Sequence, residues 1–113
     1  MKKVIAFILL IFPVGISLAS EKLIIPSDAK ASYEVLLLEK PSATERILAT
    51  KRTGPTGLVD YSKIRINCTA STFQGLGEGE TLEAMNNHKP TKEGLPVIEG
   101  SIKFYQVKYA CSQ

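Results

Sequence analysis

The middle of the chain alternates apolar and polar residues with the period of two that is typical of β-strands. Within residues 58–68, one face of the expected strand carries Ile64, Ile66 and Cys68. The residues between them, which face the other way, are polar: Lys63, Arg65 and Asn67. A strand of this kind buries one face and leaves the other in water. The pattern therefore predicts that Ile64 and Ile66 are buried and that Cys68 points inward.

Shorter stretches rich in strand-forming residues lie on both sides of this segment. The Gly-Pro-Thr-Gly sequence at 54–57 is a strong turn signal and predicts a hairpin. Pro26 lacks the backbone N–H that a central strand needs, so residues 20–32 are expected to be an extended edge or a lead-in. The expected strands are residues 33–39, 46–52, 58–68 and, as a short fourth strand, 69–76.

The second half of the chain changes to turn signals and helix signals. Gly-Leu-Gly-Glu-Gly at 75–79 is expected to form a flexible loop. Thr81 is a good N-cap for a short helix that ends at Asn87. Residues 88–96 contain two prolines and a glycine, and they are expected to form an exposed loop.

The C-terminal segment fits two structures. Its residues alternate as they do in a strand, with Tyr105, Val107, Tyr109 and Cys111 on one face. In a helix capped by Ser101, the apolar residues form two faces. One face carries Phe104, Val107 and Cys111, and the other carries Ile102, Tyr105 and Tyr109. Periodicity alone leaves the choice between helix and strand open.

The first residues have the three parts of a secretory signal peptide. Two lysines precede an apolar run over residues 4–12, and small residues occupy positions Ser17 and Ala19. The run ends at Pro13, short of the roughly 20 apolar residues that a spanning helix needs. We therefore expect cleavage between Ala19 and Ser20 and export to the periplasm, the cell surface or the medium.

The expected organisation is a signal peptide over residues 1–19 followed by one domain over residues 20–113. The chain has 14 Lys and Arg against 11 Asp and Glu, and loss of the two leader lysines leaves a net charge of about +1. Such a domain has no electrostatic footprint for nucleic acid and no polybasic cluster for an anionic membrane. We therefore expect no nucleic-acid partner and no transmembrane segment in the mature protein.

Both cysteines, Cys68 and Cys111, lie in the expected mature chain. An exported protein enters an oxidising compartment, where two cysteines have one intramolecular pairing available. We therefore expect a Cys68–Cys111 disulfide, and two free buried thiols are the alternative. A tetrahedral metal site needs four ligands, which the cysteines and the single histidine, His88, do not supply, so no metal is expected.

The order of these features resembles the surface-adhesion protein E family. A cysteine ends a central strand, and a proline-containing loop follows it. Ile-Glu-Gly-Ser-Ile at 98–102, the aromatic pair Phe104-Tyr105 and Cys111 come after the loop, so that the resemblance covers about residues 33–111. It implies an α+β fold in which a C-terminal helix covers an antiparallel sheet and one disulfide ties the helix to the sheet. The resemblance therefore favours a helix for the last segment.

The remaining motifs do not predict catalysis. The glycines at 75–79 lack the Lys-Ser or Lys-Thr of a phosphate loop, and Glu78 and Glu80 would repel a phosphate. Together with Glu83, these carboxylates suit the N-terminus of the expected short helix. His88 has no nucleophile motif beside it and is expected in an exposed loop. We therefore expect a protein without catalytic residues and without a cofactor.

Basic residues on two successive strands are the best candidate for a partner-binding surface. Arg52, Lys63 and Arg65 are expected to be exposed on one face of the sheet, although a solubilising surface is the plainer interpretation. With the resemblance, this surface favours an exported, non-catalytic binding or adhesion-type module for another protein or surface macromolecule. The alternative is a periplasmic inhibitor or immunity protein that blocks a secreted enzyme, such as a cell-wall hydrolase, with the loop at 54–57.

Overall fold

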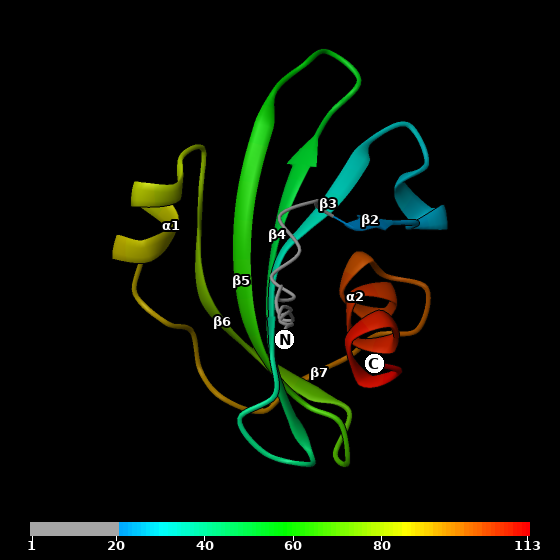
Figure 1. The fold of residues 1–113 in the computed structure, drawn as a ribbon, viewed down its shortest axis with the longest axis vertical. Helices are drawn as coiled ribbons and strands as arrows, with labels where there is room; N and C mark the ends of the chain where they lie inside the picture. Colours follow the sequence, from blue (N-terminus) through cyan, green and yellow to red (C-terminus); the bar gives the residue numbers. More distant parts are fainter. Residues whose placement is uncertain (1–20) are drawn as a thin grey trace, which may run out of the picture.

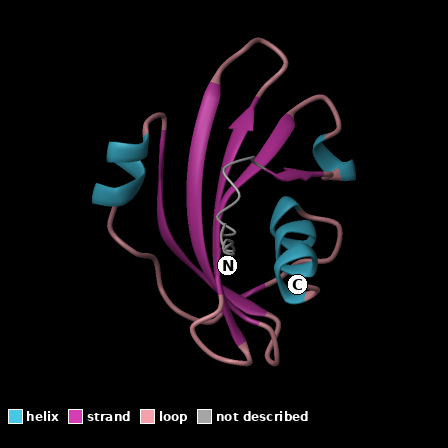
Figure 2. Cartoon of the chain, in the orientation of Figure 1, coloured by secondary structure: helices cyan, strands magenta, loops and turns pink. Residues whose placement is uncertain are grey.

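The computed structural model describes residues 21–113, which form a six-stranded antiparallel sheet, two α-helices and a short 3₁₀ helix (Figures 1 and 2). Each strand pairs with the next in the chain, in the order β2-β3-β4-β5-β6-β7. The expected signal peptide and its cleavage site lie outside the described residues. No helix in the described range is long and apolar enough to cross a membrane. The elements are β2 (Glu21–Leu23), η3 (Pro26–Asp28), β3 (Ser32–Glu39), β4 (Glu45–Thr53), β5 (Val59–Asn67), β6 (Thr72–Gly79), α1 (Leu82–Asn87), β7 (Leu95–Pro96) and α2 (Ile102–Cys111).

The sheet is strongly curved, and the two helices lie on opposite sides of it (Figure 1). Helix α2 occupies the hollow of the curve, which we call the concave face. Register shifts interrupt the ladders beside Leu37 in β3 and beside Ile64 in β5. Irregularities of this kind bend a strand and increase its twist. The curvature leaves part of the concave face uncovered by the helix.

The main core lies between the concave face and α2. Its fully buried residues come from β4, β5 and α2, and they are Leu48, Ile64, Ile66, Val107 and Ala110. Leu48 lies directly opposite Ile64 in the β4–β5 ladder, so both side chains point toward the helix. The prediction that Ile64 and Ile66 are buried is confirmed, because their exposures are 2% and 0%. A second cluster around Leu23, Ile25 and Tyr33 extends this packing to β2 and β3.

The C-terminal segment is a helix, as the resemblance favoured. Ser101 caps it, because the Ser101 hydroxyl accepts a hydrogen bond from the Phe104 backbone N–H at 3.1 Å. The helix packs on both core clusters: Val107 belongs to the main core, and Tyr105 packs against the second one. Two buried faces explain why its sequence has no single apolar stripe and why periodicity left its structure open.

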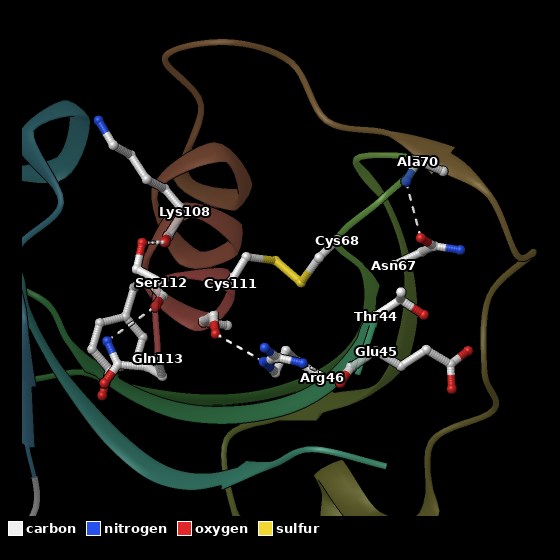
Figure 3. Close-up of a disulfide and its surroundings, with 12 residues drawn as sticks. Thr44, Glu45, Arg46, Asn67, Cys68, Ala70, Lys108, Cys111, Ser112 and Gln113 are labelled. Carbon is white, nitrogen blue, oxygen red and sulfur yellow. Dashed lines mark hydrogen bonds between the residues drawn. A yellow bond between two sulfur atoms is a disulfide. The ribbon is translucent and has the colours of Figure 1, made fainter. Parts of the chain in front are cut away.

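The expected disulfide is present and joins the sheet to the helix (Figure 3). Cys68, directly after β5, is bonded to Cys111 in the last turn of α2, and 43 positions separate the two in the sequence. Beside it, the buried guanidinium of Arg46 donates to the Ala110 carbonyl at 3.2 Å and to the Glu45 carbonyl at 2.9 Å. A cation at this position satisfies a carbonyl group in the last turn of α2, and the negative end of the helix dipole stabilises the cation.

Residues 75–79 correct the sequence-based expectation, because they form the second half of β6 rather than a flexible loop. The short helix α1 packs directly against this strand, with Thr81 as its N-cap as predicted. A Cβ atom at Gly77 would lie 1.9 Å from the Met85 carbonyl oxygen, and one at Gly79 would lie 2.5 Å from the Ala84 Cβ. The glycines are therefore needed for close contact between strand and helix, and not for flexibility.

Candidate functional site

The three basic residues expected on one face lie on two faces. The β4–β5 ladder is regular from end to end, so residues directly opposite each other share a face. Arg52 lies opposite Asp60 and therefore shares the concave face with Ile64 and Ile66. Lys63 and Arg65 lie on the other, convex face. The expectation of a single face was wrong for Arg52, because its parity in the ladder is opposite to that of the other two residues.

On the convex face, the basic side chains are partly neutralised by carboxylates of neighbouring strands. Arg65, which is exposed as predicted, lies 3.8 Å from Glu45, and Lys51 lies 3.9 Å from Glu34. Exposed pairs of this length contribute little to stability, and Lys63 is half-buried. This face is therefore a mixed polar surface rather than a strongly positive one.

On the concave face, Arg52 belongs to a small polar cluster. Its Nε donates to Asp28 at 2.6 Å, and the Tyr33 hydroxyl donates to the same carboxylate at 2.7 Å. These two hydrogen bonds hold the pKa of Asp28 below its usual value, the Arg52 contact being the larger cause. Burial, and then the hydrogen bond to Asp28, raises the pKa of Tyr33 to about 12. The cluster stays ionised as a pair at neutral pH and fixes η3 against the sheet.

The concave face changes from apolar to polar along the β4–β5 ladder. At its disulfide end, Leu48 and Ile64 face each other and are covered by α2. One step further, Thr50 faces Ser62, and their hydroxyl oxygens lie 3.1 Å apart. This polar half borders an open cavity of about 550 Å³, which we call the concave groove. Its volume lies within the roughly 300–1,000 Å³ of known ligand sites.

The groove is lined from both sides by polar residues of the sheet and of the first half of α2. The lining residues used below are Thr50, Arg52, Ser62, Glu78, Lys103 and Gln106. Ile102, Gln106 and Ala110 occur four residues apart, so they lie on one face of the helix, and Gln106 and Ala110 are buried there. The four-residue spacing on α2 thus places one polar amide between apolar neighbours.

Gln106 is the most unusual side chain of the groove. It is only 2% exposed, and its Nε2 donates to the Thr50 hydroxyl at a long 3.4 Å. Its Oε1 is buried and accepts no hydrogen bond from any residue in the range 21–113. An unsatisfied buried acceptor costs about 1–3 kcal/mol, so native structures usually avoid one. The amide therefore has an acceptor without a partner among the described residues, in a residue that borders an open cavity.

Lys103 lines the groove on the helix side. Burial lowers the pKa of Lys103, and the nearby carboxylate of Glu78 partly opposes this effect. The ammonium group also lies 5.8 Å from the centre of the Phe73 ring. Behind it is a smaller, mainly apolar cavity of about 130 Å³, bordered by Ile64, Phe73 and Leu95. The groove thus has a polar main chamber and an apolar side pocket, with Lys103, Glu78 and Ser62 common to both.

His88 follows α1 and borders both the groove and its side pocket. It is exposed, as predicted, and its Nδ1 contacts the Lys89 carbonyl oxygen at 2.9 Å. Glu78 and Glu80 also border the main chamber, and Glu78 is close enough to Lys103 to affect its pKa. These acidic residues therefore belong to the rim of the groove as well as to the region before α1.

Sequence reasoning missed the groove because its key residues are common polar types on three elements. Gln106 carries the one signal that was available. It is the polar member of an i, i+4, i+8 set whose other members are Ile102 and Ala110. In a helical interpretation of this segment, that spacing predicts a polar group turned toward the core. Thr50 and Ser62 carry no comparable signal.

The chain was compared with protein-family models, with curated proteins and with solved structures, and none of them matches it.

Proposed function

We propose that this protein is an exported, non-catalytic binding module that captures another protein or a surface macromolecule by taking one of its groups into the concave groove. The observation that carries the proposal is the buried Gln106 amide, which has an acceptor without a partner in the described part of the chain and belongs to a residue that borders an open cavity of about 550 Å³. A concave site with a few converging polar groups is the usual location of ligand binding.

The groove supports binding better than the convex face does. Its polar groups converge from β4, β5 and α2, and the disulfide and the Arg46 contacts hold α2 in place. A preformed site loses less entropy when a ligand binds. On the convex face, Arg65 and Lys51 already have carboxylate partners, which reduces the charge that is free for another molecule.

The disulfide also supports export, because such bonds persist in oxidising compartments. Together with the signal-like pattern of the first residues, it favours the periplasm or the cell surface as the place of action. Cleavage between Ala19 and Ser20 would leave a mature chain that begins one residue before β2.

A second candidate function, inhibition of a secreted enzyme, is favoured by the β4–β5 hairpin. Its turn is closed by two backbone hydrogen bonds, from Gly54 N–H to the Leu58 carbonyl at 2.8 Å and from Gly57 N–H to the Gly54 carbonyl at 3.0 Å. Leu58 is 73% exposed beside this turn, and Pro55 is also exposed. A firm loop that projects from a sheet is suited to enter the cleft of an enzyme (Figure 1).

Two matched variants on the same strand test the groove. Ser62→Tyr places a ring in the groove, whereas Arg65→Tyr places the same ring on the convex face. Aromatic residues are well tolerated in strands, so both variants are expected to fold. Immobilised mature protein is exposed to periplasmic and extracellular fractions, and the captured material is quantified. We expect capture to fall by about tenfold or more for Ser62→Tyr and to stay unchanged for Arg65→Tyr.

The opposite result, loss of capture only with Arg65→Tyr, would move the binding surface to the convex face and refute the proposal. The alternative function has its own assay, in which Leu58→Ser is compared with wild type for inhibition of secreted cell-wall hydrolases. Inhibition that is lost with Leu58→Ser and retained with Ser62→Tyr would favour the inhibitor.

A further inference from the structure

We infer that the concave groove recognises a neutral, N-acylated sugar unit of a glycan. The inference rests on the proposed function, since it names the chemical group that the proposed groove takes. Three properties of the groove lead to it: its lining has an excess of carboxylates, its uncharged hydrogen-bonding groups include an acceptor without a partner within residues 21–113, and an apolar side pocket shares lining residues with its main chamber.

Carboxylates outnumber cations around the groove, because Asp60, Glu78 and Glu80 line it together with Arg52 and Lys103. Arg52 donates to Asp28 at 2.6 Å and lies 3.7 Å from Asp60. Lys103 faces the carboxylate of Glu78. An anionic ligand would meet this excess of carboxylates, and a ligand that displaced one partner of an existing ion pair would leave the other uncompensated, which is costly. A cationic group would lose hydration in the apolar side pocket, so the two spaces together favour a ligand without charge.

The hydrogen-bonding groups that remain are an amide and two hydroxyls. Gln106 needs a donor for Oε1, while Thr50 and Ser62 each act as donor or acceptor. A sugar offers hydroxyls that both donate and accept, and an N-acyl substituent adds an N–H donor for the Gln106 carbonyl. Oε1 is buried in the free protein, so ligand binding requires a rotation about the terminal torsion of Gln106, which is broad in glutamine, to present Oε1 to the ligand.

The side pocket distinguishes an N-acyl sugar from a simple one. Its volume is about 130 Å³, and Ile64, Phe73 and Leu95 contribute an apolar lining. It opens beside the polar chamber, with which it shares Ser62. A ligand that fits both spaces combines a polar ring with a small apolar substituent, as an acetamido sugar does. A hexose without the substituent would leave the side pocket empty.

The inference is tested by titrating the ¹⁵N-labelled mature protein with five probes and following backbone and glutamine side-chain amide signals. The neutral probes are N-acetylglucosamine, its β-linked disaccharide and glucose, and the charged probes are glucosamine and N-acetylneuraminic acid. We expect the two neutral N-acetyl probes to shift the signals of Thr50, Ser62 and the Gln106 side chain. Glucose and the two charged sugars are expected to bind about tenfold more weakly or worse.

Matched glutamine variants show whether the amide takes part. Gln106→Leu is expected to weaken binding of the disaccharide by about tenfold or more. Gln113→Leu is the control, because Gln113 is exposed after α2 and lines neither the groove nor its side pocket, so binding is expected to stay unchanged. Ser62→Ala is a second groove variant that removes one hydroxyl without adding volume, and it keeps the test valid if Gln106→Leu is poorly folded.

The outcomes separate this inference from the proposed function. Equal binding of charged and neutral sugars, or no groove shift with either N-acetyl probe, would overturn the sugar assignment. If Ser62→Tyr still abolished macromolecular capture in that case, the groove would remain the binding site and its ligand would be of another class, such as a peptide segment. If Ser62→Tyr left capture intact while the N-acetyl probes bound the groove, the proposed capture function would fail and the sugar site would stand.

Discussion

Replacing Gln106 by leucine is expected to make the free protein more stable while it weakens the proposed ligand binding. Leucine has a similar volume and fills the same place between Ile102 and Ala110 on the buried face of α2. The change removes the unsatisfied Oε1, whose burial costs about 1–3 kcal/mol. It also removes the hydrogen bond to Thr50, which at 3.4 Å is long and is worth about 0.5 kcal/mol. Thr50 keeps the Ser62 hydroxyl as a partner.

The balance of these contributions is a gain of about 1 kcal/mol in the free energy of unfolding. For a domain of this size, such a gain raises the melting temperature by about 4–8 °C. Urea and thermal unfolding of the oxidised mature protein, followed by circular dichroism, measure both quantities. A loss of 1 kcal/mol or more would refute the reasoning, because it would mean that the Gln106 amide is fully satisfied and stabilises the fold. Gln113→Leu at an exposed position is again the matched control, with little change expected.

Further predictions concern the core, the disulfide, the loss of stability at acidic pH and the N-terminus of the mature chain. In denaturant melts, Ile66→Ala is expected to lower the free energy of unfolding by about 2–5 kcal/mol, and Arg65→Ala by less than about 0.5 kcal/mol. The reverse order would contradict the register of the strand. Reducing the disulfide, which spans 43 positions, is expected to lower the free energy of unfolding by about 4 kcal/mol in the chain-entropy model. Thiol titration of the unreduced, denatured protein should find no free thiol. The pKa of Asp28 is lowered in the folded state, so the Asp28–Arg52 contact stabilises the fold above pH 3.8 and its contribution is lost as pH falls below that value. Wild type should therefore lose more stability than Asp28→Asn between pH 5 and pH 3, and parallel pH profiles would count against the contact. Intact-mass measurement of the exported protein should give a chain that starts at Ser20, and retention of the first 19 residues would exclude cleavage there.

Local patterns were sufficient for much of the fold. The strict alternation before Cys68 correctly identified the buried face of β5, because a strand has only two faces and a period of two assigns every side chain to one of them. The helix N-caps at Thr81 and Ser101 could also be predicted from the sequence, since an N-cap depends on residues that are neighbours in the chain. The helix at the C-terminus followed from the family resemblance and not from its periodicity.

Features that depend on contacts between distant segments could not be predicted from local sequence patterns. Residues 75–79 resemble a loop by composition, yet they form a strand because they pair with β5. The close approach of α1 explains why positions 77 and 79 are glycine. Arg52 was assigned to the wrong face because the relative parity of two strands depends on their register. In the structure, that register places Arg52 opposite Asp60 and within reach of Asp28.

The sequence by itself determined the pairing of two cysteines, the strand at the centre of the sheet and the helix caps, because each of these depends on residue types and short spacings. Only the tertiary structure decided where a ligand would bind. The concave groove brings Thr50, Ser62 and Gln106 together from three elements, and none of these residues is distinctive in the sequence. Their meeting depends on the curvature of the sheet and on the position in which the disulfide holds α2. A site made by the convergence of ordinary side chains has no sequence motif, since its chemistry arises from burial and proximity.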